Sequence, residues 1–270
     1  MRRADPGQLL TIASELARAA GERARAMREE GISQVSTKST PTDVVTAADR
    51  AAERLIVEEL RERRPYDHVL GEESGAHRGD GGGSRVRWLV DPIDGTVNYL
   101  YGIPYYAVSL GVEVDGEVVA GVVRNPVTGE EWSAVRGGGA HRDGRRLTGS
   151  TVTELSQTMV ATGFGYDPAR RAHQARVVAS LLAEVRDIRR FGAAALDLCL
   201  VAEGRVDAFY EKGLAPWDLA AGGLIAEAAG VLVTGLRGRP AGKRMTLAAP
   251  ASVHGELHDR LVAWDAEGGP

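Results

Sequence analysis

Apolar residues recur at helical spacing in two stretches near the start of the chain. In the first, from Leu9 to Ala20, they stand three or four residues apart, as on one face of a helix that should end near Gly31. The second follows Thr46 and keeps the same spacing until Pro65, a residue that helix interiors do not tolerate. The sequence therefore predicts two amphipathic helices before any sheet begins.

The period of the pattern changes after the second helix. Residues 67–74 and 86–91 are short strand-like runs that lead into acidic residues, and residues 106–125 alternate about Asp115-Gly116. An Asp-Gly pair between two alternating runs is a strong hairpin signal. We therefore expect a sheet in this part of the chain.

From about residue 151 strands and helices alternate, which is typical of an α/β fold. We expect one unit over residues 1–270, with an N-terminal α+β half over about 1–150 and a C-terminal α/β half over about 151–270. The expected strands of the second half lie near 159–162, 187–190 and 206–211 and around Val231 and Leu247, and the expected helices cover 168–184, 193–201, 216–229 and 253–264.

Composition and charge exclude several classes of protein. With 43% hydrophobic and 26% charged residues, the chain has the make-up of an ordinary globular protein. The net charge is -4, and the basic residues, only three of them lysines, are scattered, so nucleic acid is not an expected partner. We find no signal peptide or membrane span, and Cys199 is the only cysteine, so the cytoplasm is the expected compartment. The glycine-rich stretch 75–85 is expected to be a solvated connection between strands rather than a lid.

Acidic residues gather at four places where predicted elements begin or end, namely 43–49, 71–74, 91–96 and 216–218. Each has a structural interpretation when taken alone; Asp94, for example, suits a helix N-cap. Together they behave differently, because the carboxyl ends of strands in α/β sheets meet at one crevice. Two carboxylates about 4 Å apart repel each other by roughly 4 kcal/mol at an effective dielectric constant near 20. Such a cluster needs neutralisation.

Raised pKa values are one way to neutralise the acids, but oxygen ligands without histidine or cysteine are those that Mg²⁺ or Mn²⁺ prefers. In the segment DPIDGT the proline fixes the backbone, so Asp91 and Asp94 can converge with the Ile93 carbonyl between them. Gly95 and Thr96 then present N–H groups at the start of a helical turn, where a phosphate oxygen fits. A metal beside an anion site predicts phosphoryl chemistry.

The segments KSTPTDVVTAAD, GEES, WLVDPIDGTVNY and PWDLAAGG occur together and in this order. In them the chain resembles the inositol monophosphatase family, within the superfamily of magnesium-dependent, lithium-sensitive sugar phosphatases, from about Lys38 to Gly230. The resemblance implies a layered α-β-α-β-α sandwich of the inositol monophosphatase/fructose bisphosphatase type, with metals at the junction of its halves. It also implies a homodimer and two to three Mg²⁺ ions per site, with Mn²⁺ as an alternative.

The resemblance further implies which groups hold the ions. Glu72, Asp91 and the Ile93 carbonyl would hold the first. Asp91, Asp94 and Asp218 would hold the second, and a weaker third would depend on Glu72. Attack on the phosphate would be direct and in line, without a phosphoenzyme, so the protein supplies positioning and charge stabilisation.

Thr96 and Asp49 are implied to orient the attacking water and accept its proton, and Glu72 is counted with them as catalytic. Asp49 taken alone suits a surface position on the second helix. Lys38 and Glu73 are implied to support the site from outside, and a plain surface salt bridge is an equal alternative for them. The implied substrate contacts are Asp94, Gly95, Thr96, Ala194, Glu211 and Asp218.

Glu211 is the expected reader of a polyol hydroxyl, and its alternative is an acid paired with Arg or Lys at a strand end. The implied reaction is hydrolysis of a small phosphorylated polyol or sugar, with inositol 1-phosphate as the first expected substrate. Fructose 1,6-bisphosphate and histidinol phosphate remain alternatives, as does a regulatory or protein-binding role that retains the site. Ala193 and Val97 stand where many relatives carry Ser or Thr, which leaves the ligands intact but loosens the assignment of substrate.

Overall fold

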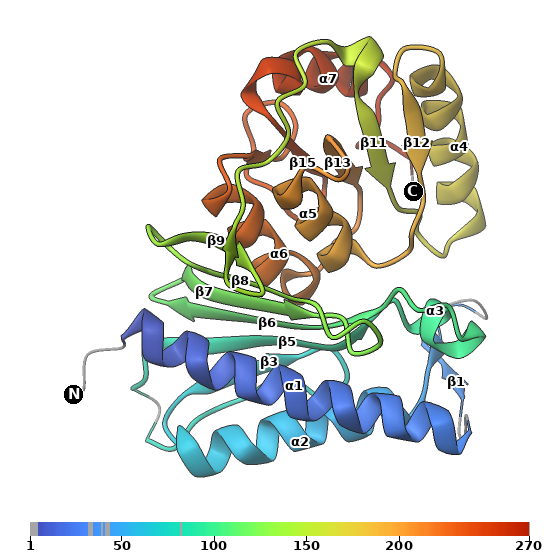
Figure 1. Cartoon of the computed structure of the whole chain (residues 1–270). Helices are drawn as coiled ribbons and strands as arrows, with labels where there is room; N and C mark the ends of the chain where they lie inside the picture. Colours follow the sequence, from blue (N-terminus) through green and yellow to red (C-terminus); the bar gives the residue numbers. More distant parts are fainter. Residues whose placement is uncertain (1–4, 32–34, 39, 41–43, 82, 270) are drawn as a thin grey trace.

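The computed structural model describes residues 5–31, 35–38, 40, 44–81 and 83–269. Helices α1 and α2 lie on one face of an eight-stranded sheet, α5 and α6 lie between it and a five-stranded sheet, and α4 and α7 lie on the far side (Figure 1). This confirms the predicted α-β-α-β-α sandwich. Across the described ranges, none of the helices is long and apolar enough to cross a membrane. The helices are α1 (Pro6–Glu30), α2 (Ala47–Arg63), α3 (Thr96–Tyr101), α4 (Pro168–Leu182), α5 (Ala194–Glu203), α6 (Pro216–Ala228) and α7 (Ala251–Ala263).

The two N-terminal helices have clear start and stop signals. Asp5 precedes α1 and accepts the Gly7 N–H at 3.1 Å, and the helix ends at Gly31, whose φ of 111° suits glycine. Thr46 and Asp49 form a reciprocal capping box at the start of α2. The apolar faces of α1 and α2 pack with the strands in one cluster around the buried Trp88. The predicted pair of amphipathic helices is therefore confirmed.

The eight-stranded sheet has the order β10-β9-β8-β7-β6-β5-β3-β4. Its neighbours β3 and β5 are parallel, and β5 and β6 are antiparallel. The predicted hairpin is β6–β7, which turns through Asp115 and Gly116 at φ values of 54° and 84°. The sequence did not predict β4 or β8 to β10. The bounds are β3 (His68–Gly71), β4 (Gly75–His77), β5 (Val86–Asp94), β6 (Ala107–Val114), β7 (Glu117–Arg124), β8 (Glu131–Val135), β9 (Gly139–Arg142) and β10 (Arg145–Arg146), with β1 (Ser36–Thr37) and β2 (Val44–Val45) forming a separate pair.

The five-stranded sheet has the order β12-β11-β13-β15-β14. Its first three strands are parallel, and β15 is antiparallel to both of its neighbours. Every strand and helix predicted for this part of the chain is present, while the division into halves near residue 150 stays a prediction. The bounds are β11 (Met159–Thr162), β12 (Asp187–Arg189), β13 (Ala208–Glu211), β14 (Leu232–Thr234) and β15 (Thr246–Ala249), preceded by the short helix η1 (Leu155–Gln157).

Helix α6 packs unusually close to the eight-stranded sheet. A side chain at Gly111 would place its Cβ 2.5 Å from the Cβ of Ala220, and one at Gly121 would place it 2.9 Å from the Cα of Ala221. Small residues on both surfaces therefore allow the contact. The hydroxyl of Ser109, on β6, lies 3.3 Å from the carbonyl oxygen of Trp217 in the first helical turn. This packing fixes the N-terminus of α6 over β5 and β6.

Candidate active site

The parallel pair β3–β5 brings two of the predicted acids together. Glu72 follows the end of β3, and its N–H donates to the Val90 carbonyl oxygen at 3.1 Å. Asp91, the next residue of β5, hydrogen-bonds to the Glu72 side chain. The predicted meeting of Glu72 and Asp91 therefore holds, although Asp91 lies inside β5 and not at its end.

Strand β5 does not end at Asp91 as its sequence suggested but continues to Asp94. Asp91 is opposite Ser109 and Asp94 is opposite Ala107, so β5 has one residue more than β6 between these pairs. This is a β-bulge, and it contains Pro92, which cannot donate to a ladder. The bulge allows both aspartates to belong to one strand and still reach the same region.

The turn after the bulge is fixed by short polar contacts. The Ile93 N–H donates to Asp91 Oδ1 at 3.0 Å. Thr96 Oγ1 lies 3.0 Å from Asp49 Oδ1 and 3.1 Å from the Ile93 carbonyl oxygen, and its single proton serves one of them at a time. Gly95, between them, has a φ of 92°, a left-handed conformation that favours glycine. The turn leads directly into α3, as the helical turn expected there requires.

Asp49 is fully buried, so the interpretation of it as a surface residue is wrong. Its Oδ2 accepts the Thr46 N–H at 2.8 Å and also the Thr46 hydroxyl, and its Oδ1 faces Thr96. Burial raises the pKa of Asp49, although the hydrogen bonds from Thr46 and Thr96 favour its charged form. The capping box of α2 thus fixes a carboxylate against the Thr96 hydroxyl.

Asp94 connects this turn to the second sheet's helices. Its carboxylate accepts the N–H groups of Ala194 at 3.2 Å and Ala195 at 2.8 Å, in the first turn of α5. Ala193, at the N-cap position, offers no side-chain acceptor. The Asp94 side chain therefore caps the N-terminus of α5 from a distant part of the chain, rather than the helix that follows it in sequence. Ala194 is mostly buried at this contact.

Asp218 approaches the same acids from α6. Its Oδ2 accepts the Ala215 N–H at 2.7 Å, which holds the side chain at the helix start, and it also hydrogen-bonds to Asp91. Asp91 thus lies between Glu72 and Asp218, with Asp94 nearby. The structure therefore places Glu72, Asp94 and Asp218 close enough to Asp91 for their charges to act on it.

Burial and mutual repulsion raise the pKa values of this group. Burial, followed by the charges of Glu72, Asp94 and Asp218, raises the pKa of Asp91 well above its ordinary value, and this side chain is only 2% exposed. Burial also raises the pKa of Asp94 to about 7 and that of Asp218 to about 8. These groups cannot all carry negative charge unless cations balance them, and without cations some of them must be protonated.

The chemistry of the donor set suits a hard divalent cation. The four side chains and the Ile93 carbonyl offer only oxygen, as Mg²⁺ and Mn²⁺ require. Within the described residues, no three side chains form a ready ligand cluster; instead the carboxyl group of Asp91 lies against those of Glu72 and Asp218.

Lys38 is an exposed residue whose ammonium group forms ion pairs with two of the acids. Its Nζ is 2.8 Å from Glu72 Oε1, and it also donates to Glu73 Oε1. Burial works against the Lys38 charge, but the two carboxylates outweigh it and raise the pKa of Lys38. Burial raises the pKa of Glu73 to about 7 despite this contact. Lys38 therefore holds two successive glutamates of the GEES turn.

Glu211 ends β13 and faces the same region. Burial and the charge of Asp197 raise the pKa of Glu211 to about 8, while the charge of Arg190 partly offsets this. A side chain at Gly163 would place its Cβ about 2.0 Å from the Glu211 carboxylate, so the two strands approach closely there. Among the described contacts no Arg or Lys forms a salt bridge with Glu211, although the charge of Arg190 acts on it.

Comparison with known proteins decides the family. The family model described as the inositol monophosphatase family matches residues 5–265. The chain belongs to the inositol monophosphatase family. It is 46% identical over 276 aligned residues to the inositol-1-monophosphatase SuhB of Mycobacterium tuberculosis, covering 96% of this chain and 93% of the relative. It is 40% identical over 231 residues to the Nus factor SuhB of Escherichia coli, covering 85% of this chain and 86% of the relative.

A solved structure supports the same assignment. The extragenic suppressor protein suhB of Bartonella henselae superposes with a TM-score of 0.87 at 38% identity, covering 94% of this chain and 98% of that one. The resemblance inferred from four motifs is therefore confirmed over nearly the whole length. Family membership alone does not choose among substrates.

The sequence interpretation missed a buried acid of this inositol monophosphatase family member that lies near the site on α5. Asp197, on α5, is 1% exposed and accepts the Tyr105 hydroxyl at 2.8 Å. Burial raises the pKa of Asp197 to about 8. An acid inside the apolar run LDLCL was the available signal, because an unpaired carboxylate is rarely placed in a core.

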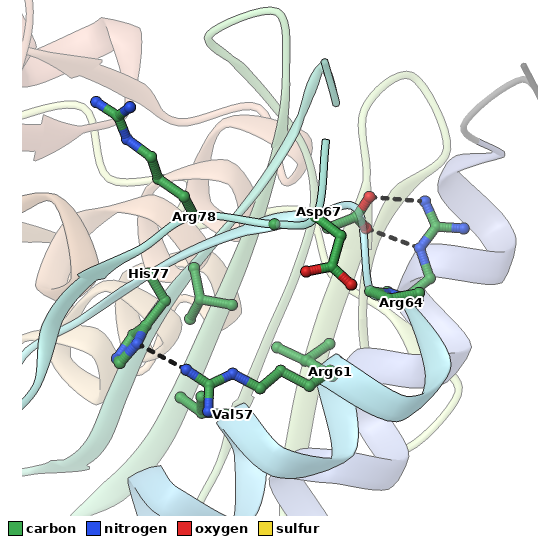
Figure 2. A pocket seen from close by; sticks show the side chains of 11 residues that line it. Val57, Arg61, Arg64, Asp67, His77 and Arg78 are labelled. Carbon is green, nitrogen blue, oxygen red and sulfur yellow. Dashed lines mark hydrogen bonds and ion pairs between the residues drawn. The ribbon is translucent and has the colours of Figure 1, made fainter. Parts of the chain in front are cut away.

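A cavity of about 130 Å³ lies beside α2, and none of the predicted site residues lines it. Figure 2 shows Arg61 pointing toward His77 and Arg64 paired with Asp67, whereas Arg78 extends away from Arg61. Asp67 neutralises Arg64, and Asp80 partly offsets the other two arginines of the lining, so the cavity is not a strongly basic site. The candidate chemistry therefore stays with the acidic cluster.

Proposed function

We propose that the chain is a Mg²⁺-dependent phosphomonoesterase that hydrolyses a small polyol or sugar phosphate, with inositol 1-phosphate as its expected substrate. The observation that carries this proposal is the position of Asp91. Its buried carboxyl group lies between Glu72 and Asp218 and beside Asp94, in a chain of the inositol monophosphatase family. Such a set of oxygens is suited to divalent cations and to little else.

Under this proposal Glu72, Asp91 and the Ile93 carbonyl hold one ion, and Asp94 and Asp218 join Asp91 at a second. A third ion depends on Glu72, and Mn²⁺ can substitute for Mg²⁺. When bound, such ions neutralise the carboxylates, polarise the phosphate and make water more acidic. The remaining chemistry is the task of the protein's own groups.

Asp49 and Thr96 are proposed to handle the proton of the attacking water. The Thr96 hydroxyl is within hydrogen-bond distance of Asp49 Oδ1, and the raised pKa of Asp49 makes this buried carboxylate a better proton acceptor. Backbone N–H groups at Gly95 and Thr96 are proposed to hold phosphate oxygens. In-line attack then needs no nucleophilic side chain.

The alcohol part of the substrate is proposed to lie toward the second sheet. Glu211 would accept a hydrogen bond from a substrate hydroxyl, and Asp94, Asp218 and the backbone at Ala194 would line the same space. Lys38 and Glu73 would support Glu72 from outside. Ala193 has no hydroxyl and would offer the substrate no side-chain hydrogen bond.

A substrate panel tests the proposal. Inositol 1-phosphate, fructose 1,6-bisphosphate and histidinol phosphate should be assayed for released phosphate, with Mg²⁺ and with a chelator, for the wild type and Asp91→Asn. We expect Mg²⁺-dependent turnover of inositol 1-phosphate, inhibition by Li⁺, and loss of nearly all turnover in the variant. Absence of turnover with every substrate and metal would refute the enzymatic proposal.

A second candidate function is a regulatory, protein-binding role that retains the site. It is favoured by one observation, the 40% identity to a relative named a Nus factor. The two functions separate in cells that depend on this protein: Asp91→Asn should preserve a purely regulatory role and abolish an enzymatic one. We further propose a cytoplasmic homodimer, which analytical ultracentrifugation and cell fractionation would test.

A further inference from the structure

Glu53 is a buried carboxylate that faces the turn bearing Glu72. It lies on the inner face of α2 and is 1% exposed. Its Oε2 accepts the Glu73 N–H at 2.9 Å, and its Oε1 accepts the Ser74 N–H at 2.7 Å. Each carboxylate oxygen thus serves one amide of the GEES turn, immediately after the candidate ligand Glu72.

The chain leaves space for this contact at one particular residue. A side chain at Gly71 would place its Cβ 2.5 Å from the Glu53 carboxyl carbon and from one of its oxygens. Gly71 is not in the left-handed region, so the glycine is needed for space rather than for backbone conformation. Any larger residue must displace the Glu53 carboxylate or the turn.

The same helix holds the turn at a second point. Ser74 Oγ lies 2.5 Å from Nε2 of His77, and Arg61, two helical turns after Glu53, lies 3.3 Å from Nδ1 of the same ring (Figure 2). One turn before Glu53, α2 carries Asp49, which faces Thr96. A single rigid helix therefore sets the positions of both Asp49 and the turn of Glu72.

We propose that Glu53 is a positioning residue that holds Glu72 ready for a divalent cation. The inference rests on the proposed function, since it requires that Glu72 binds metal. Groups that orient a metal ligand typically raise metal affinity by about 10- to 100-fold, because the ligand does not have to be ordered when the ion binds. Glu53 does this through two backbone amides rather than through the ligand's own side chain.

Calorimetric titration of Mg²⁺ and Mn²⁺ into the full-length, metal-free protein tests the proposal without any substrate. Glu53→Gln keeps the size of the side chain but sets an amide NH₂ group against one N–H donor. Gly71→Ala disturbs the same contact from the opposite side. Glu58→Gln, on the exposed face of the same helix, makes the same chemical change away from the turn and is the matched control.

We expect the dissociation constant to rise at least about tenfold in Glu53→Gln and Gly71→Ala, with unchanged stoichiometry in the folded protein, and no change in Glu58→Gln. Circular dichroism and thermal melts would confirm that each variant is folded at the temperature of titration. If Glu53→Gln does not fold, Gly71→Ala decides the matter. Wild-type affinity in the folded variants would overturn the role of Glu53, whereas absence of metal binding by the wild type would overturn the proposed function itself.

Discussion

Replacing Asp91 with asparagine is expected to stabilise the metal-free protein while abolishing its activity. Asp91 Oδ1 accepts the Ile93 N–H, a bond that an asparagine oxygen retains. The second carboxyl oxygen of Asp91 faces Glu72 and Asp218. An asparagine NH₂ group in its place has two N–H donors, one for each of these carboxylates, and carries no charge. The substitution therefore keeps the local contacts and removes one negative charge from the cluster.

The size of the gain follows from the repulsion that is removed. Two unit charges about 4 Å apart at an effective dielectric constant near 20 repel by roughly 4 kcal/mol. Because a proton on Asp91 relieves part of this repulsion in the wild type, we expect a gain of about 2 to 4 kcal/mol in the free energy of unfolding at pH 8. For a chain of this size, that corresponds to a rise in melting temperature of about 4 to 16 °C.

The pH dependence has a definite sign. The pKa of Asp91 is higher in the folded than in the unfolded protein, so ionisation destabilises the folded state as pH rises above the unfolded value. At low pH both states are protonated and the advantage of asparagine disappears. The gain should therefore be small near pH 4 and largest at pH 8.

Thermal melts in the presence of a chelator, and then at saturating Mg²⁺, provide the assay. An ion at 100 times its dissociation constant adds about 2.7 kcal/mol to the stability of a protein that binds it. The wild type should gain from Mg²⁺, and the variant should gain little. A lower melting temperature for Asp91→Asn in chelator at pH 8 would refute the account of charge repulsion.

Three further changes separate the roles of other residues. Asp49→Asn should lower the turnover rate, measured by phosphate release, by about 10²- to 10⁴-fold. It should also lower the free energy of unfolding, measured in urea, by about 1 kcal/mol through the weakened helix cap. Undiminished turnover would exclude Asp49 as the proton acceptor. Glu211→Gln should raise KM for a polyol phosphate and leave calorimetric Mg²⁺ binding unchanged; altered metal binding would contradict its assignment to the substrate side. Gly111→Ala should destabilise the protein by about 1 to 3 kcal/mol, because the new methyl group meets Ala220 at 2.5 Å. An unchanged midpoint of urea unfolding would contradict the close packing of α6.

Features set by neighbouring residues could be predicted from the sequence. The spacing of apolar residues located α1 and α2, and Asp115-Gly116 located the β6–β7 hairpin. Strands β8 to β10, at one end of the eight-stranded sheet, were not predicted because they follow one another through short turns, with no helical pattern between them to set them apart. The bulge in β5 was missed for a related reason: strand pairing across Pro92 depends on β6, not on the local sequence.

The acids of the candidate site were predictable as a group, but their partners were not. Sequence motifs identified Asp94, yet its partners are backbone amides about 100 residues away. Glu53 looked like any helical glutamate, because only the fold shows that its carboxylate meets the Glu73 and Ser74 amides. Contacts of this kind involve main-chain atoms, which leave no side-chain pattern in the sequence.

Contacts between the two sheets' elements also constrain how the site can move. Asn98 Nδ2 donates to the Tyr105 carbonyl at 2.7 Å and to the Phe191 carbonyl at 2.8 Å, and the rings of these two residues stack with centroids 5.0 Å apart. A hinge opening here would break these bonds and the Asp94 bonds to α5, and would exchange each for bonds to water at a net cost of about 0.5 to 1.5 kcal/mol. The closed arrangement is therefore favoured, and we expect local movement of loops around a fixed set of acids to admit substrate at a lower cost than hinge opening.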